Sequence, residues 1–248
     1  MKYYLLIILL ITLNVSAQKT TLYCIGDSTM ANKIDPDKNP EHGWCQVLQP
    51  FFGESVIVAN KAVNGRSTKS FIATKLWDSV YKSLKKGDYV FIQFGHNDGK
   101  VTDSLRYTNP HTAYRYNLIR FVTESRAKGA IPILFSSIAR RKFNEQGVLI
   151  SSHGDYPLEA RLVAKELNVP FIDLEYYTEI LEQSYGPEKS KILHLHYKAG
   201  EIAYYPEGKV DDTHLSLLGA TEIAKLAIEQ IKLSDNPLLK KLKKGIKN

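Results

Sequence analysis

The stretch Thr21-Leu22-Tyr23-Cys24-Ile25-Gly26-Asp27-Ser28-Thr29-Met30 decides how the rest of the chain is interpreted. Its first half is apolar and favours a β-strand, and the run stops at a Gly-Asp-Ser turn. Loops at the carboxyl ends of parallel strands carry ligands in α/β sheets, so the hydroxyl of Ser28 is well placed to react. Gly-Asp-Ser is also ordinary turn and helix-cap chemistry. Ser28 is therefore a candidate nucleophile whose partners must come from elsewhere in the chain.

Strand and helix patterns alternate five times along the 248 residues. The strands are apolar runs without strict alternation, which is typical of a parallel sheet covered on both faces. We expect an α/β fold, a three-layer α/β/α sandwich with a five-stranded parallel sheet, in a single domain over residues 18–248. The expected strands lie at 21–25, 55–60, 88–94, 131–136 and 170–174, and the expected helices lie near 42–52, 68–80, 112–128, 156–167 and 216–233.

The first 17 residues have the pattern of a signal peptide. A basic Met1-Lys2 precedes an apolar run that is too short to span a bilayer comfortably, and Val15-Ser16-Ala17 resembles a cleavage site. We expect an exported protein, periplasmic or secreted, with no stable membrane anchor. Whether Cys24 and Cys45 pair in an oxidising compartment cannot be read from their spacing.

The formal charge of +7 is partly local. The residues over 240–247 include five lysines, which predicts a solvated Lys-rich C-terminal tail. No arginine-rich stripe interleaved with aromatic residues occurs, so a nucleic-acid partner has little support.

Four polar clusters are expected on one rim of the sheet. The clusters at 26–28, 64–67 and 95–98 follow the first three strands, and 211–214 lies just before the last helix. Because the carboxyl ends of parallel strands share one edge, these clusters are expected to converge.

Together the clusters supply the groups that acyl transfer requires. Ser28 supplies a hydroxyl, His214 a base, and Asp211, three residues earlier, a carboxylate that can orient the imidazole. The backbone N–H groups of Ser28 and Gly65 and the side-chain amide of Asn97 are candidate oxyanion donors. A serine esterase is therefore predicted.

The four clusters, in this order, resemble the sequence motifs of the SGNH (GDSL-type) hydrolases. Within that superfamily, the residues of the motifs most resemble those of rhamnogalacturonan acetylesterases. The resemblance implies a flavodoxin-like sheet, catalysis without a cofactor, and an acetylated galacturonate-containing pectin backbone as substrate. Asp212 adjoins Asp211, and the family motif favours Asp211 because it places the acid three residues before the histidine. The residues implied are Ser28, His214 and Asp211 for catalysis, and Ser28, Gly65 and Asn97 for the oxyanion hole.

Other residues have two interpretations each. Arg66 can meet a galacturonate carboxylate or bind loop carbonyls, and His96 can contact substrate or pack the turn. The short basic run 140–142 can bind a polyanion or lie solvated. Trp44 can stack on a sugar, although core packing is favoured. His194 and His196 share a strand face without an assured third ligand, so no metal is assigned.

Alternative functions remain beside deacetylation of an acidic polysaccharide. The same blocks occur in esterases of other polysaccharides such as xylan and in short-chain lipid esterases, although no long apolar insertion favours the latter. A catalytically silent glycan-binding protein is disfavoured because the full set of catalytic residue types is present.

Overall fold

A computed structural model gives the structure of residues 19–247, so the expected signal peptide at 1–17 lies outside the described residues. The central sheet consists of β1 (Thr20–Gly26), β3 (Val56–Asn60), β4 (Tyr89–Gln93), β5 (Ile131–Phe135) and β6 (Phe171–Ile172). All its pairings are parallel, in the order β3-β1-β4-β5-β6. This is the flavodoxin-like order, with a crevice expected between β1 and β4. The predicted fold class is confirmed.

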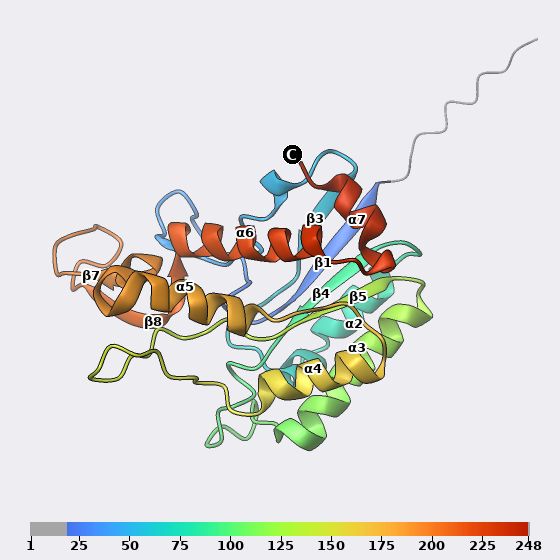
Figure 1. The fold of residues 1–248 in the computed structure, drawn as a ribbon, viewed down its shortest axis with the longest axis horizontal. Helices are drawn as coiled ribbons and strands as arrows, with labels where there is room; N and C mark the ends of the chain where they lie inside the picture. Colours follow the sequence, from blue (N-terminus) through green and yellow to red (C-terminus); the bar gives the residue numbers. More distant parts are fainter. Residues whose placement is uncertain (1–18, 248) are drawn as a thin grey trace, which may run out of the picture.

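Helices cover both faces of this sheet, as Figure 1 shows. One layer contains α5 (Leu174–Lys189), α6 (Leu217–Leu233) and α7 (Lys240–Gly245), and the other contains α1 (Thr68–Ala73), α2 (Leu76–Ser83), α3 (Arg115–Ala127) and α4 (Tyr156–Glu166). Within residues 19–247, no helix is both long and apolar enough to cross a membrane.

Alternate side chains of the central strands enter two separate cores. In β1, Leu22 and Cys24 pack with the α6 side, whereas Tyr23 and Ile25 pack with α2, α3 and α4. Burial on both faces explains why the strands read as continuous apolar runs. Trp44 is also a core residue, as favoured, and its indole N–H donates to Gln93 Oε1 at 2.6 Å.

The prediction of a helix over residues 42–52 is wrong. The segment contains β2 (Glu41–His42), turns, and the one-turn 3₁₀ helix η1 (Gln49–Phe51). Gly43 lies against the backbone of Met30 so closely that a Cβ would be 2.4 Å from its carbonyl oxygen. The apolar spacing reflects burial of side chains across the Ser28 turn, where a regular helix would not fit.

The helix expected over 68–80 is two short helices. Ser67 caps α1, because its Oγ accepts from the Ser70 N–H at 3.1 Å. Lys75 then adopts a left-handed φ of 59°, which ends the first helix and starts α2. Phe71 of α1 and Val80 of α2 nevertheless pack in the same core, which is why the apolar residues on both sides of the break have the spacing of one helix.

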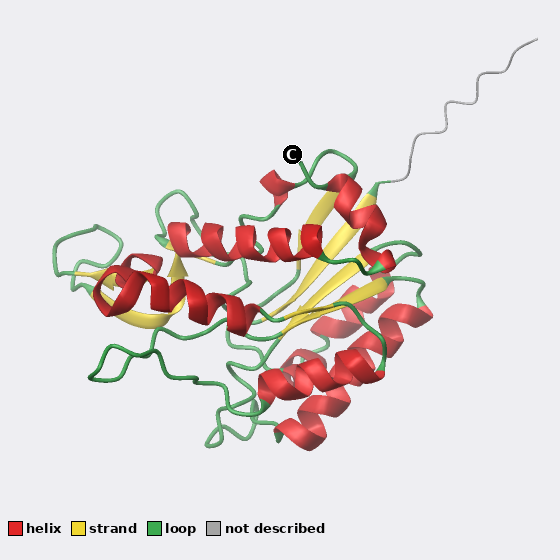
Figure 2. Ribbon diagram, viewed as in Figure 1, coloured by secondary structure: helices red, strands yellow, loops and turns green. Residues whose placement is uncertain are grey.

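Three further elements were not predicted. Helix α5 begins directly after β6, and the strands β7 (His194–Tyr197) and β8 (Lys209–Ser216) form a small antiparallel sheet with β2 in the order β2-β8-β7. This small sheet lies apart from the central sheet (Figure 2). The cluster at 211–214 belongs to β8, and not to a simple loop before the last helix.

The lysine-rich end is docked and is not a solvated tail. Leu239, Leu242 and Ile246 are buried in the core beneath α6, and Tyr89 Oη accepts from the Leu242 N–H at 3.2 Å. Most of the lysines face solvent because the apolar residues recur at helical spacing and turn the charges outward. The prediction of a solvated tail rests on the charges alone, whereas the apolar residues between the lysines dock the segment on the core.

Replacement of Leu242 by Ala is expected to lower the free energy of unfolding by about 2–5 kcal/mol, because a fully buried side chain is removed. Urea denaturation followed by circular dichroism measures this change. The matched control is Lys244→Ala, at an exposed position of the same helix, which should stay within about 0.5 kcal/mol of the wild type. Equal stability of the two variants would contradict a structural role for α7.

Candidate active site

The turn after β1 holds Ser28 beside a buried carboxylate. Asp27 Oδ1 accepts from the Thr29 backbone N–H at 3.0 Å and from its hydroxyl at 2.9 Å, and the Asp27 carbonyl accepts from Met30 and Ala31 N–H groups. These bonds close the chain into a tight turn at the carboxyl end of the strand. Ser28 is 8% exposed, so the residue is largely sheltered from solvent.

His214 reaches Ser28 from the small antiparallel sheet. His42 and Glu41 of β2 pair with Leu215 and Ser216 of β8, directly after the histidine. His214 Nε2 lies 2.9 Å from Ser28 Oγ, and its Nδ1 lies 2.8 Å from Asp211 Oδ2. An ionised carboxylate only accepts hydrogen bonds, so Nδ1 carries the proton and Nε2 accepts the Ser28 hydroxyl.

Asp211 is held as the orienting carboxylate. Its Oδ1 accepts from the N–H groups of Thr213 and His214, both at 2.9 Å. Burial by itself raises the pKa of Asp211, but hydrogen bonds from the His214 side chain and backbone outweigh this effect and hold the pKa well below its usual range. Asp211 therefore stays ionised opposite the imidazole.

The neighbouring Asp212 faces different partners. Its Oδ1 accepts from Arg141 Nη1 at 2.7 Å and lies 2.7 Å from His196 Nε2. The choice that the sequence left to a motif is thus settled geometrically: Asp211 meets His214, and Asp212 fastens β8 to the loop that follows β5.

The three expected oxyanion donors come from the loops that follow β1, β3 and β4. Asn97, which follows β4 and is 3% exposed, donates from Nδ2 to the Arg66 carbonyl at 3.1 Å. A primary amide has two N–H groups, so the second can meet a ligand. Gly65 has a φ of 71°, which glycine adopts without strain. With the Ser28 N–H, these groups can stabilise the anion of a tetrahedral intermediate.

Ser28, His214 and Asp211, the residues expected as nucleophile, base and orienting acid, thus form one hydrogen-bonded line. The model of the GDSL-like lipase/acylhydrolase family matches residues 24–220. The chain belongs to this family. Membership in this family, together with similarity to esterases over most of the chain, shows that the protein is a carboxylic ester hydrolase.

Alignments with similar proteins cover most of this chain. Rhamnogalacturonan acetylesterase RhgT of Bacillus subtilis is 40% identical over 217 residues, which are 88% of this chain and 91% of RhgT. The probable rhamnogalacturonan acetylesterase YesY of the same organism is 33% identical over 88% of this chain and 94% of YesY. The crystal structure of B. subtilis YxiM is similar with a TM-score of 0.73 and 26% identity, covering 87% of this chain and 57% of that one.

Lys33 is a residue of the site that sequence reasoning missed. Its buried ammonium donates to the Ser28 carbonyl at 2.6 Å and to Asn64 Oδ1 at 2.7 Å, and pairs with Glu41 Oε1 at 2.8 Å. It thus connects the nucleophile turn, the Gly65 loop and β2 of the acylhydrolase. A single lysine in a polar loop carries no sequence signal for this role, because only the fold removes it from solvent.

Asp98 performs a second joining role. Its carboxylate accepts from the Thr68 N–H at 3.1 Å and the Thr108 hydroxyl at 2.7 Å, so the Asn97 loop is tied to the start of α1. Burial raises the pKa of Asp98 to about 7, although the hydrogen bonds from Thr68 and Thr108 act in the opposite direction. The Gly-His-Asn-Asp block therefore combines a donor, Asn97, with an anchor, Asp98.

The two expected substrate-binding residues lie in different surroundings. Arg66 is half-buried in a hollow of about 370 Å³ beside Gly65, and no carboxylate of residues 19–247 lies within 4 Å of its guanidinium. His96 is buried against His153, with ring centroids 4.5 Å apart. Burial, together with the electrostatic effects of His153 and Arg140, lowers the pKa of His96 well below its usual value, so the His96 ring is neutral.

The His194–His196 pair serves the protein scaffold. His194 Nε2 lies 2.6 Å from Glu182 Oε1, and its Nδ1 lies 3.1 Å from the His214 carbonyl oxygen. His196 contacts Asp212, as described above. Among residues 19–247, no group of three or more His, Cys, Asp or Glu side chains could hold a metal ion.

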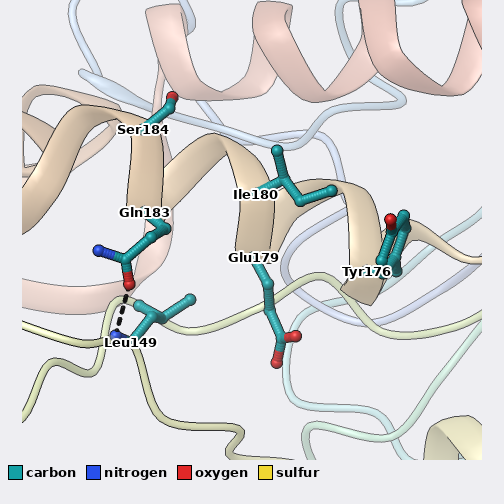
Figure 3. A pocket seen from close by; sticks show the side chains of 6 residues that line it. All are labelled: Leu149, Tyr176, Glu179, Ile180, Gln183 and Ser184. Carbon is teal, nitrogen blue, oxygen red and sulfur yellow. Dashed lines mark hydrogen bonds between the residues drawn. The ribbon is translucent and has the colours of Figure 1, made fainter.

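A hollow of about 500 Å³ on α5 lies outside the candidate active site around Ser28 and His214. Figure 3 shows that it is lined by α5 side chains and by Leu149, whose N–H donates to Gln183 Oε1 at 2.8 Å. None of the reacting residues contributes to its wall. Its side chains include a carboxylate, Glu179, but no nucleophile–base pair, so the hollow is not the site of ester chemistry.

Replacement of Lys33 by Met is expected to lower kcat about 100-fold with a smaller change in KM, because the Ser28 and Asn64 loops lose their common anchor. Initial rates on para-nitrophenyl acetate measure both constants, and circular dichroism checks folding. Lys38→Met, at an exposed lysine nearby, is the control and should match the wild type. An unchanged kcat in a folded Lys33→Met variant would contradict this positioning role.

Proposed function

We propose that this acylhydrolase removes O-acetyl groups from the rhamnogalacturonan backbone of pectin through an acetyl-serine intermediate. The observation that carries the mechanism is the continuous hydrogen-bond line from Ser28 Oγ through His214 to Asp211. It matches what a serine nucleophile needs at neutral pH, a base within hydrogen-bond distance that is itself oriented by a carboxylate.

The proposed reaction proceeds in two halves. His214 Nε2 takes the Ser28 proton as Oγ attacks the acetyl carbonyl carbon, and the resulting oxyanion accepts hydrogen bonds from the Ser28 and Gly65 N–H groups and the Asn97 amide. The C–O bond to the sugar then breaks, and the imidazolium returns its proton to the sugar oxygen. In the second half His214 deprotonates a water, which attacks the acetyl-serine, and acetate leaves as Ser28 regains its proton.

The substrate proposal rests on homology and charge. The relatives at 40% and 33% identity are both named as rhamnogalacturonan acetylesterases. The chain carries a formal charge of +7, and the Arg66 guanidinium stands beside Gly65 without an acidic partner among the described residues. A cation at this position suits a galacturonate carboxylate. We further propose export through the N-terminal signal pattern, which would bring the enzyme to an extracellular or periplasmic polymer.

Acetate release should be highest from acetylated rhamnogalacturonan when it is compared with acetylated homogalacturonan and xylan at equal acetyl content. An enzymatic acetate assay measures it, and Ser28→Ala should lose about 10³-fold or more of the rate because the nucleophile is gone. Serine-dependent release mainly from xylan would keep the mechanism and overturn the substrate. Release unaffected by the Ser28 change would overturn the mechanism, and binding without any hydrolysis would favour a silent glycan-binding protein.

The two adjacent aspartates provide a matched pair for the orienting role. Asp211→Asn should lower kcat about 10³- to 10⁴-fold, because an amide no longer holds His214 with its proton on Nδ1. Asp212→Asn keeps the side-chain size at a position that faces Arg141, so kcat should fall much less. Steady-state kinetics on para-nitrophenyl acetate compare them. A larger loss of kcat in Asp212→Asn than in Asp211→Asn would show that the assignment of the orienting role to Asp211 is wrong.

A further inference from the structure

A second polar hollow adjoins the reacting groups. It has a volume of about 290 Å³ and lies between the loop after β4 and the loop after β5. We call it the Arg140 hollow, and its charged and imidazole side chains are those of His96, Lys100, Arg140 and His153. His96 directly precedes Asn97, and its Nδ1 lies 4.0 Å from the Oδ2 of Asp27, the neighbour of Ser28. The hollow is therefore next to the nucleophile turn.

Two buried imidazoles in its wall have unused hydrogen-bonding atoms. His96 is 3% exposed and His153 is 4% exposed. Within residues 19–247, neither ring nitrogen of His96 has a hydrogen-bond partner, and neither does His153 Nε2. Buried polar atoms are normally paired, because an unpaired one costs free energy. These nitrogens point to a ligand that supplies the missing partner.

The hollow also holds two cations without acidic partners. No carboxylate of the described residues lies within 4 Å of the Arg140 or Lys100 side-chain nitrogens. Arg140 donates to the carbonyls of His96 and Ser152, each at 3.2 Å, so its guanidinium is fixed in place while other N–H groups remain for a ligand. Burial, followed by the charges of Arg106 and Arg140, lowers the pKa of Lys100, while Asp103 and Asp27 act in the opposite direction.

The nearest acidic groups do not cancel this charge. Glu175 Oε1 is occupied by His153 Nδ1 at 2.9 Å. Asp27 Oδ1 accepts from Thr29, whereas its Oδ2, 4.0 Å from His96 Nδ1, has no hydrogen-bond partner within the described residues. Burial raises the pKa of Asp27, which favours its neutral form. A small ligand with a negative charge and two acceptor oxygens fits these donors, since a carboxylate can bind a guanidinium through both oxygens.

We propose that the Arg140 hollow binds a carboxylate group, with Arg140 and Lys100 as its cationic contacts and the imidazole of His96 as a hydrogen-bond partner. The volume, about 290 Å³, suits one such group and part of one sugar rather than an oligosaccharide. Resting on the proposed function, the occupant is the carboxylate of a uronate residue next to the acetylated sugar. Acetate, the expected product, has the same chemistry and is the second possible source.

The experiment measures inhibition of para-nitrophenyl acetate hydrolysis, a substrate without a carboxylate. Unacetylated trigalacturonate, its neutral methyl ester and sodium acetate are compared as inhibitors at constant ionic strength. The proteins are the wild type, Lys100→Gln, Arg140→Gln and the control Lys82→Gln, whose exposed lysine lies at the far end of α2. Each inhibition constant is compared with that of the wild type.

We expect trigalacturonate, and not its methyl ester, to inhibit the wild type. Its inhibition should weaken about threefold in Lys100→Gln and about tenfold or more in Arg140→Gln, in line with an exposed and a half-buried charge contact. Lys82→Gln should match the wild type. The same losses for acetate in place of trigalacturonate would support the carboxylate site and identify the product as its occupant.

Several results would overturn the inference. The first is equal inhibition of all four proteins, and the second is no inhibition of the wild type by either carboxylate. The third is an inhibition that weakens in Lys82→Gln as much as in the two hollow variants. The fourth is an inhibition that weakens only in Arg140→Gln, together with a fall in the kcat of that variant without inhibitor. The last result would mean displaced loops. Because unacetylated ligands are used, failure here is distinct from failure of the proposed function, which is decided by acetate release from the polymers.

Discussion

Backbone pairing between β8 and β2 sets the distance between the base and the nucleophile. Ser28 belongs to the central sheet and His214 to the small sheet, and 186 positions separate them in the chain. The ladder from Glu41 and His42 to the end of β8 lies within the small sheet. The residues directly after β2 join it to the Ser28 turn, because the Trp44 N–H donates to the Thr29 carbonyl at 2.9 Å. Ser216 then caps α6 by accepting from the Gly219 N–H. Because such a ladder has a fixed register, it places one side chain, that of His214, against Ser28.

Buried polar contacts refine what this ladder begins. Lys33 binds backbone and side-chain oxygens of two active-site loops and the Glu41 carboxylate of β2. Asp98 ties the Asn97 loop to α1, and Arg141 ties the loop after β5 to Asp212 of β8. Such contacts are costly when incomplete, so they favour one arrangement of the loops over near alternatives. The loops can then present donors and acceptors without rearranging at each turnover, which is the requirement of electrostatic preorganisation.

Two hollows with cationic side chains lie beside the candidate site. The strand order reverses on either side of β1, and the loops after β1 and β4 diverge from this point toward opposite helical layers. Arg66 lies on the Gly65 loop, whereas Arg140 lies on the loop after β5, and each lines a separate hollow near Asn97 or its neighbour His96. Asn97 thus stands between two cationic environments, an arrangement suited to a polymer with repeated negative charge.

The sequence by itself predicted the central sheet, which the structure confirms, and named Ser28 and His214 as candidate nucleophile and base. Strands buried on both faces must be apolar throughout, and the Gly-Asp-Ser, Asn-Gly and Gly-His-Asn-Asp turns had to follow them, so both signals are local. Only the tertiary structure decided which aspartate meets His214, that Lys33 is a buried anchor, that the lysine-rich end docks on the core, and that β8 is a strand. The reason is physical: the choice of aspartate, the burial of Lys33 and the pairing of β8 depend on partners distant in the chain and leave no periodic pattern nearby. The lysine-rich end has apolar residues at helical spacing, but the surface that they dock on is formed by distant parts of the chain.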